Sequence, residues 1–152
     1  MSSTSSQLHI HILGQDRPGI LAETLSFIVQ NGWNVVDIKQ FVFNGLLNLS
    51  ILLDGYDAPH IQPLQDALSA YAEEMNFKVT IYPWETDTRP DAHYSYRSVV
   101  TLLCDSIPSS GFQEITQIFA NLDINILRIE QLDSGDIQAL EFVIGTRQAH
   151  SI

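Results

Sequence analysis

The sequence predicts an α+β protein made of ferredoxin-like βαββαβ units in tandem, the second of which is truncated after its third strand. Three observations support this prediction. Strand and helix periodicities follow one another in the order strand, helix, strand, strand, helix, strand. An Asn-Gly pair, which favours a two-residue hairpin turn, separates the two central strands. The same pattern then begins again 91 positions along the chain.

The first strand is indicated by strict alternation, in which Leu8, Ile10 and Ile12 share one face and His9 and His11 share the other. The run "PGILAETLSFIVQNG" then predicts a helix, because proline and glycine suit its first turn and Asn-Gly suits its end. Helical spacing relates the apolar positions of this run, which are Ile20, Leu21, Leu25, Ile28 and Val29.

The remaining elements of the first unit follow from the same rules. Residues 35–42 and 46–53 predict two strands joined by a tight hairpin at Asn44-Gly45. A second helix is expected to start at Pro59, and residues 78–84 predict a fourth strand. The apolar side of this second helix comprises Leu64, Leu68, Tyr71 and Met75. The order βαββαβ implies four antiparallel strands with both helices on one face.

An internal duplication is indicated by a constant offset of 91 residues, which places Asn34 on Asn125 and Gln40 on Gln131 without a gap. By this offset Pro59 corresponds to His150, so the second unit is expected to lack its last helix and strand. We therefore expect the chain to be a piece of something longer or to borrow these elements from a partner. The expected divisions are a disordered leader (1–7), a first unit (8–84), a linker (85–96) and an incomplete second unit (97–152).

Composition narrows the class of partner. The formal net charge of −11 argues against nucleic-acid phosphate and anionic membrane as direct partners. Cys104 is the only cysteine, which excludes an intramolecular disulfide and fits a reducing cytoplasm. No apolar run approaches the roughly 20 residues that span a bilayer.

The run "LGQDRPGILAETLSFIVQNGWNVVDIKQ" resembles the start of an ACT domain, a small regulatory module that binds amino acids, most specifically at "DRPGI" and "GWNV". Together with "VVDIKQFVFNGLLNLSILLDG", "FKVTIYPW", "YRSVVTLLCDSI" and "NILRIEQL", it is similar to the tandem ACT region that precedes the catalytic domain of bacterial phosphoserine phosphatases. The resemblance implies that the chain binds a small amino acid, with L-serine as the favoured ligand. This binding would regulate an enzyme of serine biosynthesis allosterically. Magnesium would be needed only by a downstream catalytic domain.

Two other functions stay open. One is a stand-alone double-ACT regulator of amino-acid metabolism that acts by protein–protein contact, as in repressors of glycine cleavage. The other is a structural dimerisation module without a ligand. No paired-aspartate nucleophile motif or other catalytic constellation occurs in the sequence, so we expect no catalysis by this chain alone.

The loop "DRPGIL" has the chemistry that a free amino acid requires. Pro18 fixes φ in the first helical turn, and Gly19 lets a ligand or another backbone come close. Free N–H groups around Gly19, Ile20 and Leu21 form an anion site, while Asp16 can accept a hydrogen bond from an ammonium group or cap the helix. The alternative interpretation is that Asp16, Pro18 and Gly19 serve only to start the helix.

In the ACT family the ligand lies between paired units, which implies a homodimer. Carried over to this chain, the resemblance implicates Asp16, Arg17, Gly19, Ile20 and Leu21, with Asn34 or Asn125 from the opposing unit. Asn34 could instead be only a turn residue. In the second copy Ile107 stands in place of Asp16, and residues 108–110 replace Arg17-Pro18-Gly19, so we expect one functional loop per chain.

Two other features were considered as sites. His9 and His11 share a strand face, but no Cys or Asp at ligand spacing supplies a third metal ligand, so no metal site is predicted. Cys104 lies in the apolar run "VVTLLC", and we expect a buried, inert thiol.

Overall fold

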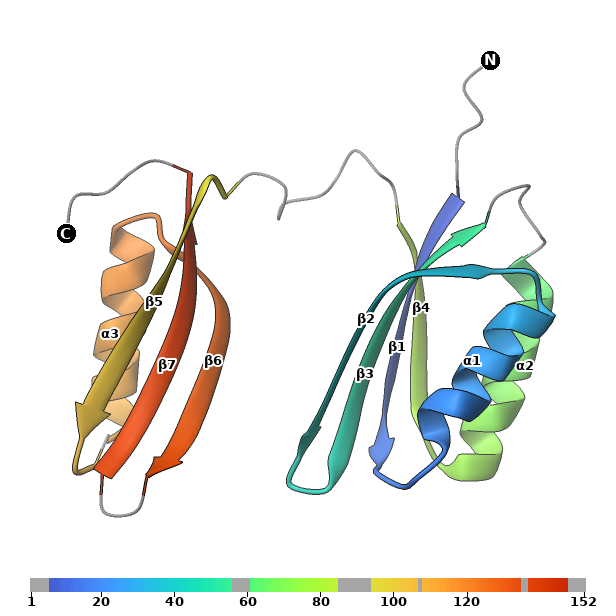
Figure 1. Ribbon diagram of the computed structural model, residues 1–152, viewed down its shortest axis with the longest axis horizontal. Coiled ribbons are helices and arrows are strands. Elements are labelled where there is room, and N and C mark those ends of the chain that lie inside the picture. Colours follow the sequence, from blue (N-terminus) through green and yellow to red (C-terminus); the bar gives the residue numbers. More distant parts are fainter. Residues whose placement is uncertain (1–5, 56–60, 85–93, 107, 135–136, 148–152) are drawn as a thin grey trace. The chain divides into compact units, whose positions relative to one another are not determined.

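The computed structural model describes residues 6–55, 61–84, 94–106, 108–134 and 137–147. The chain forms two compact units, Met1–Thr88 and Arg89–Ile152, each of which is described by itself (Figure 1). Within the described residues, no helix is long and apolar enough to cross a membrane.

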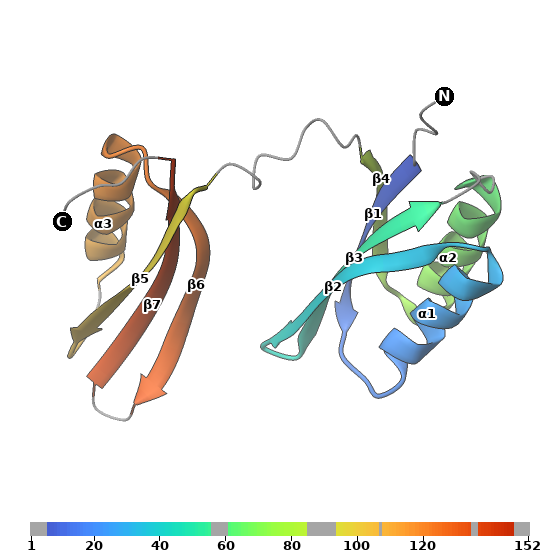
Figure 2. The ribbon, with the colours of Figure 1, turned by 45° about the horizontal axis from the view of Figure 1, so that its top comes forward.

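Unit 1 has the predicted order of strands and helices. Its elements are β1 (Ser6–Gln15), α1 (Ile20–Gln30), β2 (Asn34–Phe43), β3 (Leu46–Gly55), α2 (Ile61–Met75) and β4 (Lys78–Trp84). The sheet has the order β2-β3-β1-β4, and every neighbouring pair is antiparallel. Both helices lie on the same face of this sheet (Figures 1 and 2), which confirms the ferredoxin-like arrangement.

Positive backbone φ angles occur at the predicted turns. Asn44 (φ 48°) and Gly45 (φ 78°) form the hairpin between β2 and β3, as the Asn-Gly pair predicted. Gly32 (φ 76°) follows the end of α1, where the chain must turn toward β2. The predicted helix start at Pro59 lies outside the described residues, and α2 begins at Ile61.

The core of unit 1 lies between the sheet and the two helices. Inward-facing strand residues such as Ile10, Ile12 and Ile51 are fully buried. From the helices, α1 contributes Ile28, and α2 contributes Leu68. The other core residues are Leu8, Ile20, Trp33, Leu47, Leu49, Leu53 and Leu64.

One predicted core position is wrong. Val29 is 70% exposed, whereas Thr24 is fully buried. Four residues, or just over one turn, separate Thr24 from both Ile20 and Ile28, so these three side chains form one stripe toward the sheet. Val29 is one position beyond this stripe and points to solvent. The rings of Phe27 and Tyr71, 5.0 Å apart, join α1 to α2.

Unit 2 comprises β5 (Tyr96–Cys104), α3 (Ser109–Asn121), β6 (Asn125–Ser134) and β7 (Ile137–Thr146). Its described sheet has the order β5-β7-β6, and α3 covers one face. Leu140, Phe142 and Ile144 of β7 form the buried core, against which Phe112, Ile115 and Phe119 of α3 pack. The offset of 91 residues places the counterpart of the Asn44-Gly45 turn at Gly135-Asp136, which lies outside the described residues.

The structure supports the duplication in detail. A register irregularity interrupts β2 between Val35 and Asp37, and another interrupts β6 between Ile126 and Arg128, at an offset of 91 residues. Asp123 (φ 55°) likewise takes the left-handed conformation of Gly32.

The offset is not constant, however. Ile10 pairs with Ile51 in unit 1, but in unit 2 Val100, rather than Thr101, pairs with Phe142. The first strand is therefore related by 90 residues, and the prediction of a gap-free match is wrong there. The reason is physical, because this phase turns Val100 rather than Thr101 toward the apolar core. The change from an offset of 90 to one of 91 residues therefore falls between Cys104 and Ser110.

Gly14→Ala tests the close packing at the end of β1. A Cβ at Gly14 would lie 2.0 Å from Cδ1 of Phe77, so the ring must move. We expect the free energy of unfolding in urea to fall by about 1–3 kcal/mol, as in overpacked cores. Adding Phe77→Leu should recover part of this loss. A single substitution without loss of stability would contradict this account of the packing.

Candidate ligand-binding site at the start of helix α1

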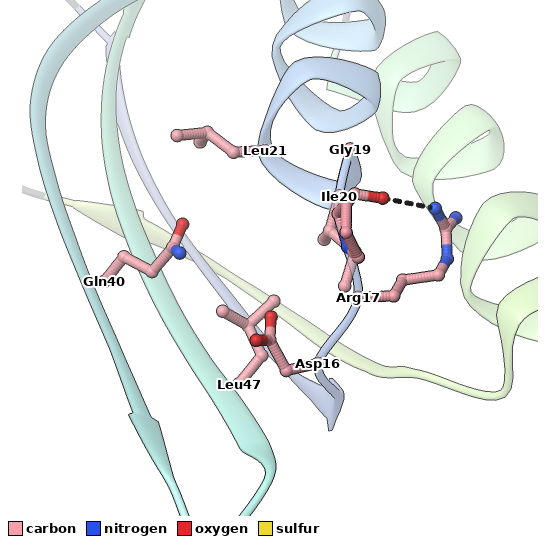
Figure 3. A pocket seen from close by; sticks show the side chains of 8 residues that line it. Asp16, Arg17, Gly19, Ile20, Leu21, Gln40 and Leu47 are labelled. Carbon is pink, nitrogen blue, oxygen red and sulfur yellow. Dashed lines mark hydrogen bonds between the residues drawn. The ribbon is translucent and has the colours of Figure 1, made fainter.

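The loop between β1 and α1 lines a pocket of about 300 Å³, which also reaches β2 and β3. The pocket is lined by Asp16, Arg17, Pro18, Gly19, Ile20, Leu21, Gln40 and Leu47. Figure 3 shows the side chains of Asp16, Leu21, Gln40 and Leu47 around this space, with Gln40 extending from β2. Five of the seven predicted site residues therefore line one pocket.

Backbone geometry explains why N–H groups are available here. Gly19 is the N-cap of α1 with φ 95°, a left-handed conformation that favours glycine. The first helical hydrogen bond runs from Glu23 N–H to the Gly19 carbonyl (2.9 Å). The N–H groups of Ile20 and Leu21 therefore precede the hydrogen-bonded ladder of the helix.

Asp16 is not a helix cap, because no side chain caps α1. Its backbone N–H instead donates to the Gly45 carbonyl (2.9 Å), which ties the loop to the β2–β3 hairpin. Within the part of the chain that the structure describes, its carboxylate has no hydrogen-bond or ion-pair partner. Asp16 thus lines the pocket with a carboxylate that no described side chain pairs with.

Arg17 is engaged elsewhere. Its guanidinium donates two hydrogen bonds to the Glu23 carboxylate, from Nη1 to Oε1 (3.0 Å) and from Nη2 to Oε2 (2.7 Å). It also donates to the Pro18 carbonyl (3.1 Å), and Nη2 lies 3.2 Å from Sδ of Met75 on α2. Figure 3 shows the guanidinium directed toward α2 and away from Gln40 and Leu47. Arg17 therefore holds the loop in place and does not point into the pocket.

Tyr71 extends this cluster onto α2. Its hydroxyl donates to Oε2 of Glu23 (2.8 Å). Burial, together with this hydrogen bond, raises the pKa of Tyr71 to about 12. The hydrogen bonds from Arg17 and then Tyr71 lower the pKa of Glu23, and the hydrogen bond to Glu23 raises the pKa of Arg17. We call Arg17, Glu23, Tyr71 and Met75 the loop clamp.

The two predicted asparagines are not among the residues that line this pocket. Asn34 pairs with Asp54, at the end of the sheet opposite to the Asn44-Gly45 hairpin that contacts the loop. Asn125 pairs with Gly145 in unit 2. Their predicted role from an opposing unit stays a prediction.

Sequence reasoning missed Gln40 and Leu47. Gln40 occupies the same strand face as Ile38, which packs on the core. A polar residue at an inward position of a strand is the signal that could have identified it. No hydrogen bond links the Gln40 carboxamide to another described residue, so it is available to a ligand.

The corresponding loop of unit 2 is built differently. Pro108, with φ −69° and ψ 153°, is the N-cap of α3, and no side chain caps this helix. Ser110, at the position of Gly19, lies inside α3. Ile107 lies outside the described residues. Unit 2 therefore lacks the left-handed glycine that opens the pocket in unit 1.

The other candidate residues are not among those that line the pocket. Burial and the neighbouring His11 lower the pKa of His9. Cys104 is only partly buried, contrary to expectation, and its Sγ lies 3.9 Å from the Gln138 carbonyl. Among the described residues, no group of three or more His, Cys, Asp or Glu side chains could hold a metal ion.

The fold is a ferredoxin-like unit with a small pocket, lined by polar and apolar residues, at the start of its first helix. Residues 6–82 match the family model of the ACT domain. The chain belongs to the ACT domain family.

Two relatives and two solved structures place the chain further. Phosphoserine phosphatase from Streptomyces coelicolor is 28% identical over 137 residues, 90% of this chain and 33% of that protein. The chain thus spans a third of that relative's length. A UPF0237 protein from Methanococcus maripaludis is 32% identical over 73 residues, which are 47% of this chain and 81% of that protein.

The structural likenesses extend over both units. A protein assigned as a glycine cleavage system transcriptional repressor has a TM-score of 0.69 and 19% identity, over 98% of this chain and 85% of that one. An unknown protein from Galdieria sulphuraria has a TM-score of 0.73 and 15% identity, over 93% and 82%. At these identities they show the tandem fold alone.

The loop clamp makes stability depend on pH. Because the pKa of Glu23 in the folded chain lies below its ordinary value of 4.5, the stabilisation is present above that value and lost as the pH falls through the folded pKa. Glu23→Gln should therefore be less stable than the natural chain at about pH 6, and this difference should shrink toward about pH 3.

Urea denaturation at a series of pH values measures this effect. Arg17→Gln removes the main hydrogen-bond donor to Glu23. Its difference in stability from the natural chain should therefore also shrink as the pH falls. Stability profiles of the natural chain and Glu23→Gln that run parallel across this range would show that the clamp does not stabilise the ionised carboxylate.

Proposed function

We propose that the chain is a regulatory tandem ACT region that binds a small amino acid, L-serine first, in the pocket of unit 1. The observation that supports this most is that Asp16 lines one pocket together with Ile20 and Leu21, whose N–H groups lie in the first turn of α1. An amino acid carries one ammonium group and one carboxylate, which are the charges that these two features complement. Leu21 and Leu47 supply apolar contact for the aliphatic carbons.

The parent protein would be a phosphoserine phosphatase of serine biosynthesis, with the catalytic domain and its magnesium outside this chain. The support is the relative from Streptomyces coelicolor, which matches 90% of the chain and is three times as long as the matched part. In such a protein, serine binding would act as feedback by its different affinity for two arrangements of the units.

A stand-alone regulator that acts by protein–protein contact is the second candidate. It is supported by UPF0237 relatives, one of which is matched over 81% of its length by 47% of this chain, and by the tandem fold of the protein assigned as a glycine cleavage repressor. In both candidates the chain would act in the cytoplasm as a homodimer joined through its ACT units. The net charge of −11 makes nucleic acid and anionic membrane poor partners.

Asp16→Asn tests the proposed ammonium partner. Asp16 is exposed and unpaired among the described residues, so the fold should survive. We expect the affinity for serine, measured by calorimetry, to fall roughly tenfold to a hundredfold, because the ammonium group loses its ion pair and keeps at most a hydrogen bond to a neutral acceptor. Asp37→Asn, an equally exposed aspartate of β2 that does not line the pocket, is the matched control. Equal affinities in the two variants would place the amino-acid site elsewhere.

The amide groups of Ile20 and Leu21 test the carboxylate partner. On addition of serine, glycine or alanine, their NMR resonances should shift more than those of Gly111 and Phe112, the corresponding residues of α3. If no amino acid at about millimolar concentration shifts any resonance, the binding function is wrong and the structural dimerisation module becomes the better account.

Gly19→Ala is a poor probe of ligand contact. Its φ of 95° strains any other residue, and an added Cβ would lie 3.4 Å from Oε1 of Glu23 and 3.7 Å from Nη1 of Arg17. The substitution would disturb the loop clamp together with the pocket.

A further inference from the structure

We infer that Gln40 of β2 is the specificity-determining residue of the pocket in unit 1. Its carboxamide selects an amino acid whose side chain carries a neutral hydrogen-bonding group, such as a hydroxyl. The inference rests on the proposed function, because it names the class of ligand that the same pocket takes.

The polar side chains that line the pocket are Asp16, Arg17 and Gln40. The Arg17 guanidinium is turned toward α2 and donates to the Glu23 carboxylate at 2.7 Å, so it is not directed into the pocket. The side chains of Asp16 and Gln40 have no hydrogen bond or ion pair to any residue that the structure describes. The pocket therefore offers a ligand one carboxylate and one carboxamide, in addition to the N–H groups at the start of α1.

Two of these features complement the charges that every amino acid shares. The Asp16 carboxylate suits the ammonium group, and the N–H groups of Ile20 and Leu21 suit the carboxylate. Gln40 is the remaining polar group, and Figure 3 shows it across the pocket from the start of α1. A carboxamide is neutral and both donates and accepts, so it pairs best with a neutral group that does the same. A hydroxyl on the side chain of the ligand has this property.

The register of the sheet explains how Gln40 reaches the pocket. It pairs with Leu49 of β3, two positions along from the pair of Val42 and Leu47. Leu47 and Leu49 are buried beneath the helices, whereas Gln40, on the edge strand β2, is exposed. An apolar side chain would suit this inward position of the strand equally well. A polar side chain where packing does not require one is typical of a position that serves function.

Volume and charge narrow the ligand further. A pocket of about 300 Å³ lies at the lower end of the range for small-molecule sites, which favours a small side chain. A second carboxylate on the ligand would be repelled by Asp16, and Arg17 is held by Glu23 and does not offset this repulsion. Aspartate and glutamate are therefore poor ligands, whereas serine combines a small side chain with a hydroxyl.

Gln40→Met tests the inference, because methionine keeps the length of the side chain and removes the carboxamide. Calorimetry compares serine with alanine, which differ only by the hydroxyl. In the natural chain serine should bind roughly twofold to tenfold more tightly than alanine, as expected for one hydrogen bond to an exposed group. In Gln40→Met this ratio should fall to about one, while the affinity for alanine changes by less than about twofold.

Gln131→Met is the matched control. Gln131 lies 91 positions after Gln40 and pairs with Leu140 of β7, as Gln40 pairs with Leu49 of β3. Both glutamines are exposed, but in unit 2 the N-cap of α3 is a proline in an extended conformation and not a left-handed glycine. Gln131→Met should therefore keep the ratio of serine to alanine affinity that the natural chain has.

NMR on the natural chain gives a second measurement that does not require a folded variant. The side-chain NH₂ resonances of Gln40, assigned through its backbone, should shift further on saturation with serine than on saturation with alanine. The reason is that only serine presents a hydroxyl to the carboxamide. The same resonances of Gln131 should shift with neither amino acid.

The outcomes separate this inference from the proposal on which it rests. If no amino acid binds, the proposed function fails and the inference fails with it. If the natural chain binds serine and alanine equally, or if Gln40→Met weakens both to the same degree, the binding function stands and selection by Gln40 is wrong. The second result would show that Gln40 contacts a group that all amino acids share. Aspartate that binds as tightly as serine would overturn the preference for a neutral side chain.

Discussion

The burial of one sheet face beneath helices determines the other features of each unit. In unit 1 the inward side chains of β1 and β3 are almost fully buried, and each such aliphatic side chain contributes roughly 1.5–3 kcal/mol. The exposed Arg17–Glu23 ion pair contributes less to stability than this burial does, since solvent screens the pair and ordering two long side chains costs entropy. Core burial therefore holds the fold together, while the loop clamp selects one conformation for the short connection that leaves β1.

The position of the β1–α1 loop in the fold determines which groups it brings together. Because β1 is a central strand and α1 must cross back over the sheet, the loop emerges beside the β2–β3 hairpin, where Asp16 N–H bonds to Gly45. The left-handed Gly19 then aims the start of α1 at the space bordered by Gln40 and Leu47. The clamp also contacts α2 through Tyr71 and Met75. A ligand that moves the loop would therefore disturb α2, which is a physical route from pocket to helix packing.

The sequence predicted the structure correctly wherever a single pattern determined an element. Alternation located β1, Asn44-Gly45 located the hairpin, and the fold class followed. It failed where two rules competed. Val29 fits helical spacing as well as Thr24 does, and only packing against the sheet decides between them. An offset of 91 residues relates most of unit 2 to unit 1. Strand β5 follows an offset of 90 instead, because that phase turns its apolar residues toward the core. At the site, loop residues were predictable from local chemistry, whereas Gln40 and Leu47 are brought there by sheet pairing, which a local pattern does not encode.

The two units carry related folds but different loops before their first helices. Unit 1 has a loop opened by the left-handed Gly19, beside a core that two helices cover. In unit 2, Ser110 stands at the position of that glycine and lies inside α3. If unit 1 binds the amino acid, binding can change the arrangement of the units only when two such arrangements differ in their affinity for the ligand.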